Sequence, residues 1–388
     1  MKIAKIEMGI VRIPLITPFK TALRTVEEVE DVIVRITSAN GETGYGEAPP
    51  TKAITGETLE SIQETIAGKI APALRSMKEG EPEDFLKKIQ SCCAGNSSAK
   101  AAMDIAVYDL AAREAGVPLY RYLAPRSDPQ QERRQFGIPG SQSAGERREI
   151  FTDLTISVNP VPQMVEDAKI AVKRGFTEIK IKVGKEGEKD LERIRAIREA
   201  VGETVGIRVD ANQGWTPQAA VKILTRAEKM GLQLSFVEQP VKAEDLEGMA
   251  YVKAHTHTMV VADESCFHPS DAQDVFAKDA ADMVNIKLMK AGGLYEANKI
   301  AEIARSYGRN CMIGCMLESK IAVSAAAHFT AAQDVVTAVD LDGPSLCAED
   351  PYIGGPRFEG AAIRMNETPG LGIIGIKEAY LSDWQELR

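Results

Sequence analysis

Charged residues recur along the second half of the sequence at nearly regular intervals, each at the end of a strand-like run. Lys182, Asp210, Glu238, Asp263 and Lys287 follow one another at steps of 28, 28, 25 and 24 residues. A step of that size is one strand-plus-helix unit. In a barrel of such units, these positions form one ring at the carboxyl ends of the strands, where active sites of this fold lie.

The stretch EIKIK adds a second lysine to this ring. Lys180 and Lys182 stand two residues apart, so on a strand both side chains point the same way. A lone aspartate at such a position could simply cap the next helix. Capping does not explain the whole set, because it would leave several isolated charges buried at the ends of apolar strands, at a cost of several kcal/mol each.

Three carboxylates on adjacent strands compensate one another only around a cation. Asp210, Glu238 and Asp263 supply oxygen alone, which favours one Mg²⁺ per subunit, with Mn²⁺ as the alternative, over zinc. Positive charge nearby lowers the pKa of a lysine, and a neutral lysine can act as a base. Lys182 and Lys287 lie across the ring, so one could remove a proton from a carbon and the other return it from the opposite face.

The pattern from about residue 150 onward predicts the elements that position these residues. Strand-like runs alternate with helical ones, which implies right-handed βαβ units and a parallel sheet. The fold class is therefore α/β, a modified (β/α)8 barrel of the TIM type, (β/α)7β. The predicted strands cover residues 150–158, 178–184, 206–212, 235–241, 259–265, 282–290, 310–319 and 337–344.

The rest of the chain divides into a capping part and a connection. Residues 1–125 read as a strand meander, with an Asn40-Gly41 hairpin, followed by helices, and so predict an α+β capping domain. Residues 346–388 are expected to complete that domain. Residues 126–149, rich in Pro, Gly, Ser, Gln and Arg, predict a linker or inserted loop before the barrel at 150–345.

Composition limits the class of protein. The net charge is −9, so a basic footprint for nucleic acid is missing. No apolar run is long enough for a membrane span, and the start of the chain lacks a signal-peptide pattern. Six sparse cysteines fit thiols in a reducing cytoplasm, and only four histidines weigh against a histidine-built metal site. We expect a cytoplasmic homo-oligomer that acts on a small molecule.

The motifs of the ring resemble those of a known family. KIK, RVDAN, FVEQP, ADES and NIKLMKAGG are similar to the motifs of the muconate-lactonising-enzyme subgroup of the enolase superfamily, and the resemblance covers residues 1–125 and 150–388. It implies removal of the proton α to a Mg²⁺-bound carboxylate by lysine bases. Lys180, Lys182 and Lys287 would then be the catalytic lysines.

The motif DLDGP distinguishes among the activities of that subgroup. Asp340 and Asp342 face one way and resemble the carboxylate pair that holds the free α-amino group in dipeptide epimerases. Substrates of cycloisomerases carry no cation, and the pair would repel them. The alternative is a turn-forming pair before Gly343-Pro344.

The loop TPFKTALRTVEE resembles the capping-domain loop that closes over the side chain being epimerised. Arg24 would then face an acidic side chain and Phe19 would close the pocket, which implies a preference for Ala-Glu, as in recycling of peptidoglycan peptides. Arg24 could instead be a solvated loop charge. Thr155 and Cys315, at the ends of the first and seventh strands, are further candidate contacts.

Three alternatives stay open. N-acylamino acid racemisation or a β-elimination could use the same ring, and a dipeptide epimerase could prefer non-acidic side chains. A catalytically silent binding or structural barrel is the alternative from another class, although it would have no reason to bury so many charges.

Overall fold

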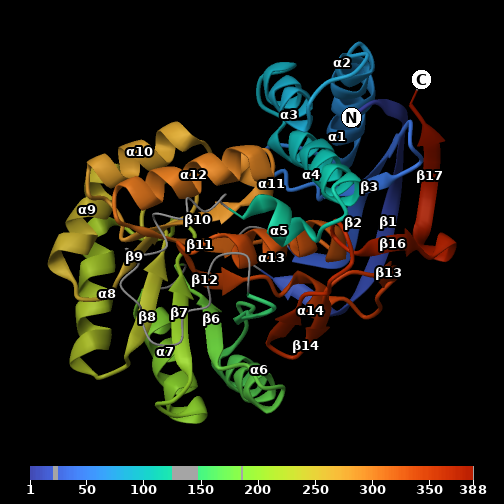
Figure 1. Cartoon of the computed structure of the whole chain (residues 1–388). Coiled ribbons are helices and arrows are strands. Elements are labelled where there is room, and N and C mark those ends of the chain that lie inside the picture. Colours follow the sequence, from blue (N-terminus) through green and yellow to red (C-terminus); the bar gives the residue numbers. More distant parts are fainter. Residues whose placement is uncertain (21–24, 125–146, 185–186, 388) are drawn as a thin grey trace.

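The computed structural model describes residues 1–20, 25–124, 147–184 and 187–387. These ranges form a capping part, which contains both ends of the described chain, and a barrel against which it packs (Figure 1). Helices α4 and α5 of the capping part and helix α13 of the barrel lie along the line of contact.

Within the described residues, one parallel sheet of eight strands runs in chain order. The backbone N–H of Asp153 donates to the carbonyl of Val339 at 3.3 Å, which brings the last strand beside the first and closes the barrel. The predicted (β/α)7β barrel with an α+β cap is confirmed. The barrel strands are β5 (Leu154–Ile156), β6 (Glu178–Lys182), β7 (Gly206–Asp210), β8 (Leu234–Glu238), β9 (Val260–Ala262), β10 (Met283–Lys287), β11 (Asn310–Gly314) and β12 (Val336–Asp340).

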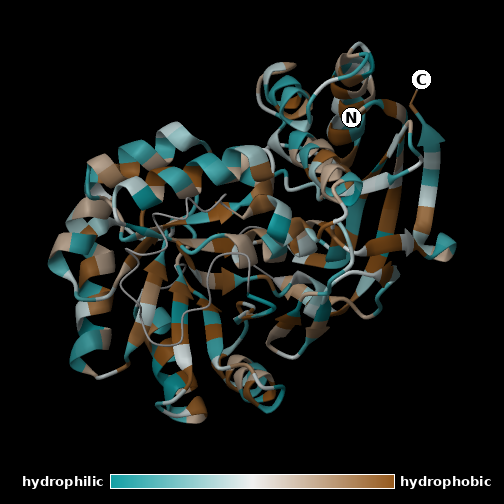
Figure 2. Ribbon diagram, viewed as in Figure 1, coloured by the Kyte–Doolittle hydropathy of each residue, from teal (hydrophilic) through white to brown (hydrophobic). Residues whose placement is uncertain are grey.

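Helices surround this barrel with polar faces outward, whereas the strands are largely apolar (Figure 2). Helix α8 shows why: Ala220, Ile223, Leu224 and Ala227 recur at helical spacing and are buried against the strands. No helix in the described ranges is long and apolar enough to cross a membrane. The barrel helices are α6 (Val161–Lys173), α7 (Glu188–Val201), α8 (Pro217–Lys229), α9 (Leu246–His255), α10 (Pro269–Ala277), α11 (Leu288–Ala291), α12 (Leu294–Ser306), α13 (Lys320–Ala332) and α14 (Gly343–Leu346).

The first predicted strand, 150–158, is wrong in its extent. The structure divides it into β4 (Glu149–Phe151), which pairs with β15 (Ala362–Arg364) outside the barrel, and β5. The break falls at Thr152, whose hydroxyl accepts from the backbone N–H of Leu341 at 2.7 Å. Because its polar groups bind two different sheets, the chain leaves one and enters the other here. The seventh predicted strand, 310–319, likewise ends earlier, with β11.

The capping part is built on an antiparallel sheet of order β17-β1-β2-β3. The predicted Asn40-Gly41 turn joins β2 to β3, with Gly41 at φ +88°. Helix α4 lies directly on β3, because a Cβ on Gly46 would meet the carbonyl oxygen of Ala102 at 1.8 Å. The strands are β1 (Ile3–Lys20), β2 (Thr25–Ser38), β3 (Thr43–Ala48) and β17 (Leu381–Glu386), and the helices are α1 (Leu59–Thr65), η1 (Ile66–Ile70), α2 (Ala71–Arg75), α3 (Pro82–Ser91), α4 (Ser97–Glu114) and α5 (Leu119–Leu123).

The C-terminal segment runs from the barrel back to this sheet. Its last strand, β17, pairs antiparallel with β1, with Glu386 opposite Glu7. The segment also forms β13 (Tyr352–Gly354), β14 (Arg357–Glu359), β16 (Ile373–Ile376) and η2 (Glu378–Tyr380).

Candidate active site

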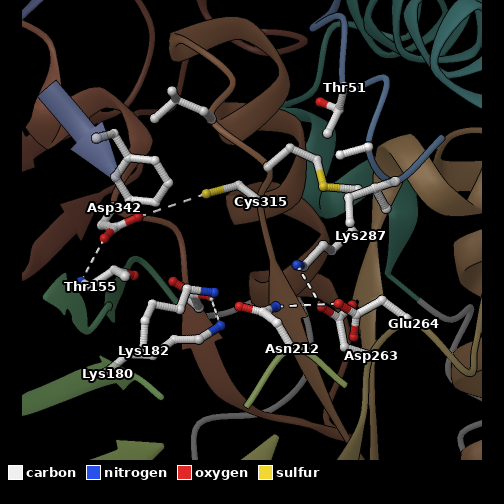
Figure 3. A pocket seen from close by; sticks show the side chains of 16 residues that line it. Thr51, Thr155, Lys180, Lys182, Asn212, Asp263, Glu264, Lys287, Cys315 and Asp342 are labelled. Carbon is white, nitrogen blue, oxygen red and sulfur yellow. Dashed lines mark hydrogen bonds and ion pairs between the residues drawn. The ribbon is translucent and has the colours of Figure 1, made fainter. Parts of the chain in front are cut away.

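The predicted ring lies at the carboxyl ends of the barrel strands, and strand register sets its level. Lys182 pairs with Asp210 on β7, and Asp210 with Glu238 on β8. Across the barrel, Lys287 and Asp340 both pair with Gly314 of β11. These positions therefore stand at one height, beside a cavity beneath the capping part (Figure 3). The lining residues are Phe19, Thr51, Ala53, Ile54, Thr155, Lys180, Lys182, Asn212, Asp263, Glu264, Lys287, Cys315, Met316, Leu317, Asp340 and Asp342.

On one side of the ring, the two lysines of β6 hold three carboxylates. Lys180 Nζ lies 2.7 Å from Glu238 Oε2, 2.8 Å from Asp340 Oδ2 and 3.1 Å from Asp210 Oδ2. Lys182 Nζ lies 2.6 Å from the same Asp210 oxygen. Both side chains of the EIKIK stretch thus point into one site, as their spacing predicted.

On the other side, two lysines bind one aspartate. Lys287 Nζ lies 2.8 Å from Asp263 Oδ2, and Lys290 Nζ lies 2.6 Å from Asp263 Oδ1. Lys290 also donates to the carbonyl of Asn285 at 3.0 Å, while the Asn285 amide donates to Glu238 Oε1 at 2.9 Å. Asn285 and Lys290 therefore connect the neighbouring carboxylates.

The charge pairs shift the pKa values of Lys180 and Lys287 upward. Burial lowers the pKa of Lys287, but the carboxylates of Asp263, Glu238 and Glu264 together outweigh it and leave that pKa well above its ordinary value. The pKa of Lys180 is likewise raised, because Asp340, Glu238 and Asp210 outweigh its burial. The lowering predicted for lysines beside a bound metal ion stays a prediction. A divalent cation would neutralise much of the negative charge that raises these values.

The chemistry of the donor set fits a magnesium ion. Asp210, Glu238 and Asp263 end neighbouring strands, are essentially completely buried and offer oxygen only. Burial, with Asp210 close by, raises the pKa of Glu238 to about 7. Among the described residues, however, no group of three or more His, Cys, Asp or Glu side chains is arranged to hold a metal ion, since lysine ammonium groups stand between the carboxylates.

Lys182 and Lys287 approach the cavity from opposite walls. They end β6 and β10, which are four places apart in the ring of strands and so face each other across the barrel. Figure 3 shows Lys182 and Lys287 on different sides of the cavity, with Asn212 between them. A carbon held in the middle can therefore meet one amine on each face.

The aspartates of DLDGP line the same cavity but have different partners. Asp340 binds Lys180, and this ammonium overcomes the effect of burial and lowers the pKa of Asp340 to about 2. Asp342 Oδ2 accepts the backbone N–H of Thr155 at 2.8 Å, and Cys315 Sγ lies 4.0 Å from its Oδ1. Burial, reinforced by Asp340, raises the pKa of Asp342 to about 6. Among the described residues, Asp342 therefore forms an ion pair with no lysine.

The structure brings most predicted site residues to one cavity. Phe19, Thr155, Asp263, Cys315, Asp340 and Asp342 line it together with the lysines. Asp210 and Glu238 do not line it, but both contact the ammonium of Lys180, which does. Arg24 lies outside the described residues.

Sequence reasoning missed several polar residues of the site. Asn212, Glu264, Asn285 and Lys290 all lie next to or within the motifs RVDAN, ADES and NIKLMKAGG, so a closer look at those motifs could have found them. Lys290 is the clearest case, because it is completely buried although the sequence placed it at the end of the sixth predicted strand, 282–290, with no role of its own.

Two family descriptions match the chain. Residues 5–123 match the mandelate racemase/muconate lactonizing enzyme N-terminal domain, and residues 163–378 match the enolase C-terminal domain-like family. The chain belongs to the mandelate racemase/muconate lactonizing enzyme family. The resemblance inferred from the ring motifs is thereby confirmed.

Several members of this family are similar over almost their whole length. The L-Ala-D/L-Glu epimerase of Clostridium acetobutylicum is 44% identical over 376 residues, which cover 97% of this chain and 99% of that protein. The substrate-liganded L-Ala-D/L-Glu epimerase of Bacillus subtilis superimposes with a TM-score of 0.90 at 43% identity, covering 97% of this chain and 99% of that one. A dipeptide epimerase of Enterococcus faecalis, complexed with Mg and L-Leu-L-Tyr, gives a TM-score of 0.87 at 39% identity, covering 97% and 100%.

Proposed function

We propose that this protein is a Mg²⁺-dependent dipeptide epimerase that inverts the C-terminal residue, with L-Ala-D/L-Glu as its substrate. The observation that carries the proposal is the pair Lys182 and Lys287 on opposite walls of one cavity. The activities of the similar proteins support it, since those proteins are epimerases of Ala-Glu and of other dipeptides.

Asp210, Glu238 and Asp263 would hold one Mg²⁺, for which Mn²⁺ is expected to substitute. When bound, the ion would supply electrostatic stabilisation to the substrate carboxylate as the neighbouring carbon loses its proton. The complex of the E. faecalis epimerase with Mg and a dipeptide supports this assignment.

The lysines would move the proton. Lys182 takes the α-proton of one epimer and Lys287 that of the other, and in each case the lysine on the opposite face then donates a proton to the carbon from its own side. Lys180, which contacts three carboxylates of the site, would orient the substrate carboxylate and keep the charges of the ring balanced. Two bases on opposite faces are what inversion at a carbon requires.

Asp340 and Asp342 would receive the free α-amino group of the dipeptide. A substrate ammonium placed between them would provide Asp342 with the cation that it lacks among the side chains around it. A substrate with a blocked amine would bring no such charge, so the pair favours dipeptides over N-acylamino acids. Phe19, Thr155 and Cys315 would complete this wall of the cavity.

A dipeptide library incubated in D₂O tests the proposal, with mass spectrometry reporting deuterium at the α-carbon. Ala-Glu is expected to gain one deuterium and form both epimers, whereas N-acylamino acids remain unchanged. Deuterium uptake by N-acylamino acids alone would overturn the dipeptide assignment, and uptake by no substrate would overturn the epimerase itself.

Arg24→Ala tests the preference for an acidic side chain. A charge-assisted contact contributes roughly 1.5–3 kcal/mol, so kcat/KM for Ala-Glu should fall on the order of 10- to 150-fold. Ala-Leu, the matched substrate without the carboxylate, should lose little. An equal loss for both substrates would contradict the role given to Arg24.

A further inference from the structure

A second cluster of buried carboxyl groups lies where the capping sheet meets the barrel. Asp31 of β2 and Glu47 of β3 are 1% and 0% exposed. They are diagonal neighbours on adjacent strands, since Ile33 is the residue opposite Glu47. Their side chains share a hydrogen bond with each other. Both therefore sit on one face of the capping sheet, turned toward the barrel.

The two carboxyl groups bind the first turn of helix α13. Asp31 Oδ2 accepts the backbone N–H of Ser319 at 3.0 Å, and Glu47 Oε2 accepts that of Ala322 at 2.7 Å. Glu47 Oε1 accepts from the Ser319 hydroxyl and, at 3.3 Å, from the Tyr352 hydroxyl. The N-terminus of a helix has unpaired N–H groups and the positive end of the helix dipole, so it favours negative charge. The pair therefore binds α13 at the end where a carboxylate stabilises it most.

The donors around each group indicate where a proton resides. Glu47 receives hydrogen bonds from Ala322, Ser319 and Tyr352, as an ionised carboxylate would, whereas Asp31 receives one backbone donor. No ion pair to either carboxyl group occurs among the described residues, and the nearby Lys320 ammonium binds Asp350 at 2.7 Å. Two carboxylates in contact without a cation repel, so one of them keeps its proton.

The segment that this pair holds leads directly into the substrate cavity. Cys315, Met316 and Leu317 line the cavity, and Glu318, just before Ser319, accepts the backbone N–H groups of Met316 and Leu317. A movement of the start of α13 therefore moves this wall of the cavity.

We propose that Asp31 and Glu47 form a positioning pair with a single proton on Asp31, through which the capping sheet sets the place of the cavity wall at residues 315–317. The predicted change in turnover rests on the proposed function, because residues 315–317 line the proposed substrate site. The predicted change in the position of residues 315–317 does not depend on that function.

The electrostatic surroundings agree with a protonated Asp31. Burial and then the neighbouring Glu47 raise the pKa of Asp31 well above its ordinary value, and burial raises that of Glu47. The other titratable groups near the pair are Glu318, Lys320, Cys347, Asp350 and Tyr352, and the ammonium of Lys320 binds Asp350 instead of the pair.

Three variants test the pair. Glu47→Gln removes the ionised member and is expected to lower kcat/KM for the dipeptide about 10- to 100-fold, the scale of a displacement of about 1 Å in a site. Asp31→Asn keeps an N–H donor toward Glu47 and should change kcat/KM little. Asp109→Asn is the matched control, because this buried carboxylate of α4 binds the N–H groups of Tyr45 and Leu371, away from the cavity. It should lose stability without loss of turnover.

Two substrate-free measurements separate this inference from the function. Infrared difference spectra of Asp31→Asn against the natural protein should lose the carbonyl band of a protonated carboxyl group. Amide hydrogen exchange at Met316 and Leu317 should accelerate in Glu47→Gln and not in Asp109→Asn. Should Glu47→Gln fail to fold, Ser319→Ala removes one of its contacts and should give a smaller acceleration at the same amides.

The positioning role is overturned if the amides of Met316 and Leu317 exchange hydrogen at the same rate in the Glu47 or Ser319 variant as in the Asp109 control. A protonated-carboxyl band that persists in Asp31→Asn, or a larger loss of turnover in Asp31→Asn than in Glu47→Gln, overturns the place of the proton. If the natural protein epimerises no dipeptide, the proposed function fails, and the exchange and infrared results still decide the pair.

Discussion

The ring at the strand ends and the Asp31–Glu47 pair are both built from buried carboxyl groups, yet their partners differ. In the ring, Asp210, Asp263 and Asp340 each lie within 3 Å of a lysine ammonium. At the joint between cap and barrel, Asp31 and Glu47 bind each other, backbone N–H groups and hydroxyls. The same residue types therefore serve in two different electrostatic settings.

The pKa values follow the partners rather than the burial. Burial raises the pKa of all these groups, but the lysines of the ring lower the pKa of Asp263 and Asp340 below the ordinary range. Without a cation, Asp31 and Glu47 keep raised values. The proposed binding of a metal ion and a charged substrate would require ionised carboxylates, whereas a joint requires fixed hydrogen bonds that no ligand disturbs.

The largest effect is expected from removing one charge of the ring. Glu238→Gln should lower epimerisation on the order of 10³-fold, as loss of a preorganised charge does at other catalytic sites, and should weaken Mg²⁺ binding measured by calorimetry. Glu57→Gln is the matched control, because this buried carboxylate of the cap binds only the N–H groups of Ser98 and Ala99 among the described contacts. Wild-type turnover by Glu238→Gln, or by protein treated with EDTA, would contradict the metal role.

Removing a lysine of the ring should separate exchange of the α-proton from epimerisation. Lys287→Ala is expected to form no epimerised product, because one of the two bases is missing. It should still exchange the α-proton of one epimer with D₂O, since Lys182 remains. Nuclear magnetic resonance of each epimer in D₂O measures this, and equal exchange of both epimers would refute the two-base scheme.

Asp342 combines features of the ring and of the Asp31–Glu47 pair, since it lines the cavity but binds a backbone N–H. Asp342→Asn should lower kcat/KM for a dipeptide with a free amine on the order of 10- to 150-fold, the worth of a charge-assisted contact of roughly 1.5–3 kcal/mol. The N-acetylated dipeptide, which lacks the charged amine, is the control, and its affinity measured by calorimetry should weaken little. A similar loss of affinity for the free and the N-acetylated dipeptide would assign Asp342 to structure alone.

The smallest effect is expected at the joint and depends on pH. Asp31 ionises near pH 4 in an unfolded chain and keeps its proton to higher pH in the folded one, so its contribution to stability is lost as pH rises above about 4. Asparagine cannot ionise. The free energy of unfolding of Asp31→Asn relative to the natural protein should therefore rise with pH, by at most about 1.4 kcal/mol per unit. Urea titrations between pH 4 and 8 measure it, and parallel curves would contradict the raised pKa.

Strand periodicity and the length of one strand-plus-helix unit determined most of the ring at the strand ends from the sequence. Lys180 and Lys182 had to face one way, and Lys182, Asp210 and Glu238 had to reach one level, because a parallel barrel repeats its register from strand to strand. Both are local rules, and a single sequence displays them. The domain boundaries, the oligomeric state and the location in the cell remain predictions.

Tertiary packing alone decided the contacts between residues that are far apart in the sequence. The break of the first predicted strand at Thr152 depends on a hydrogen bond from Leu341. The position of α13 depends on Asp31, which lies 288 residues from Ser319 along the chain. Lys290 only ends a predicted strand in the sequence, whereas the fold buries its ammonium against Asp263. Local spacing carries no record of such contacts, because they arise only when a buried polar group must find its partner wherever the packed chain places one.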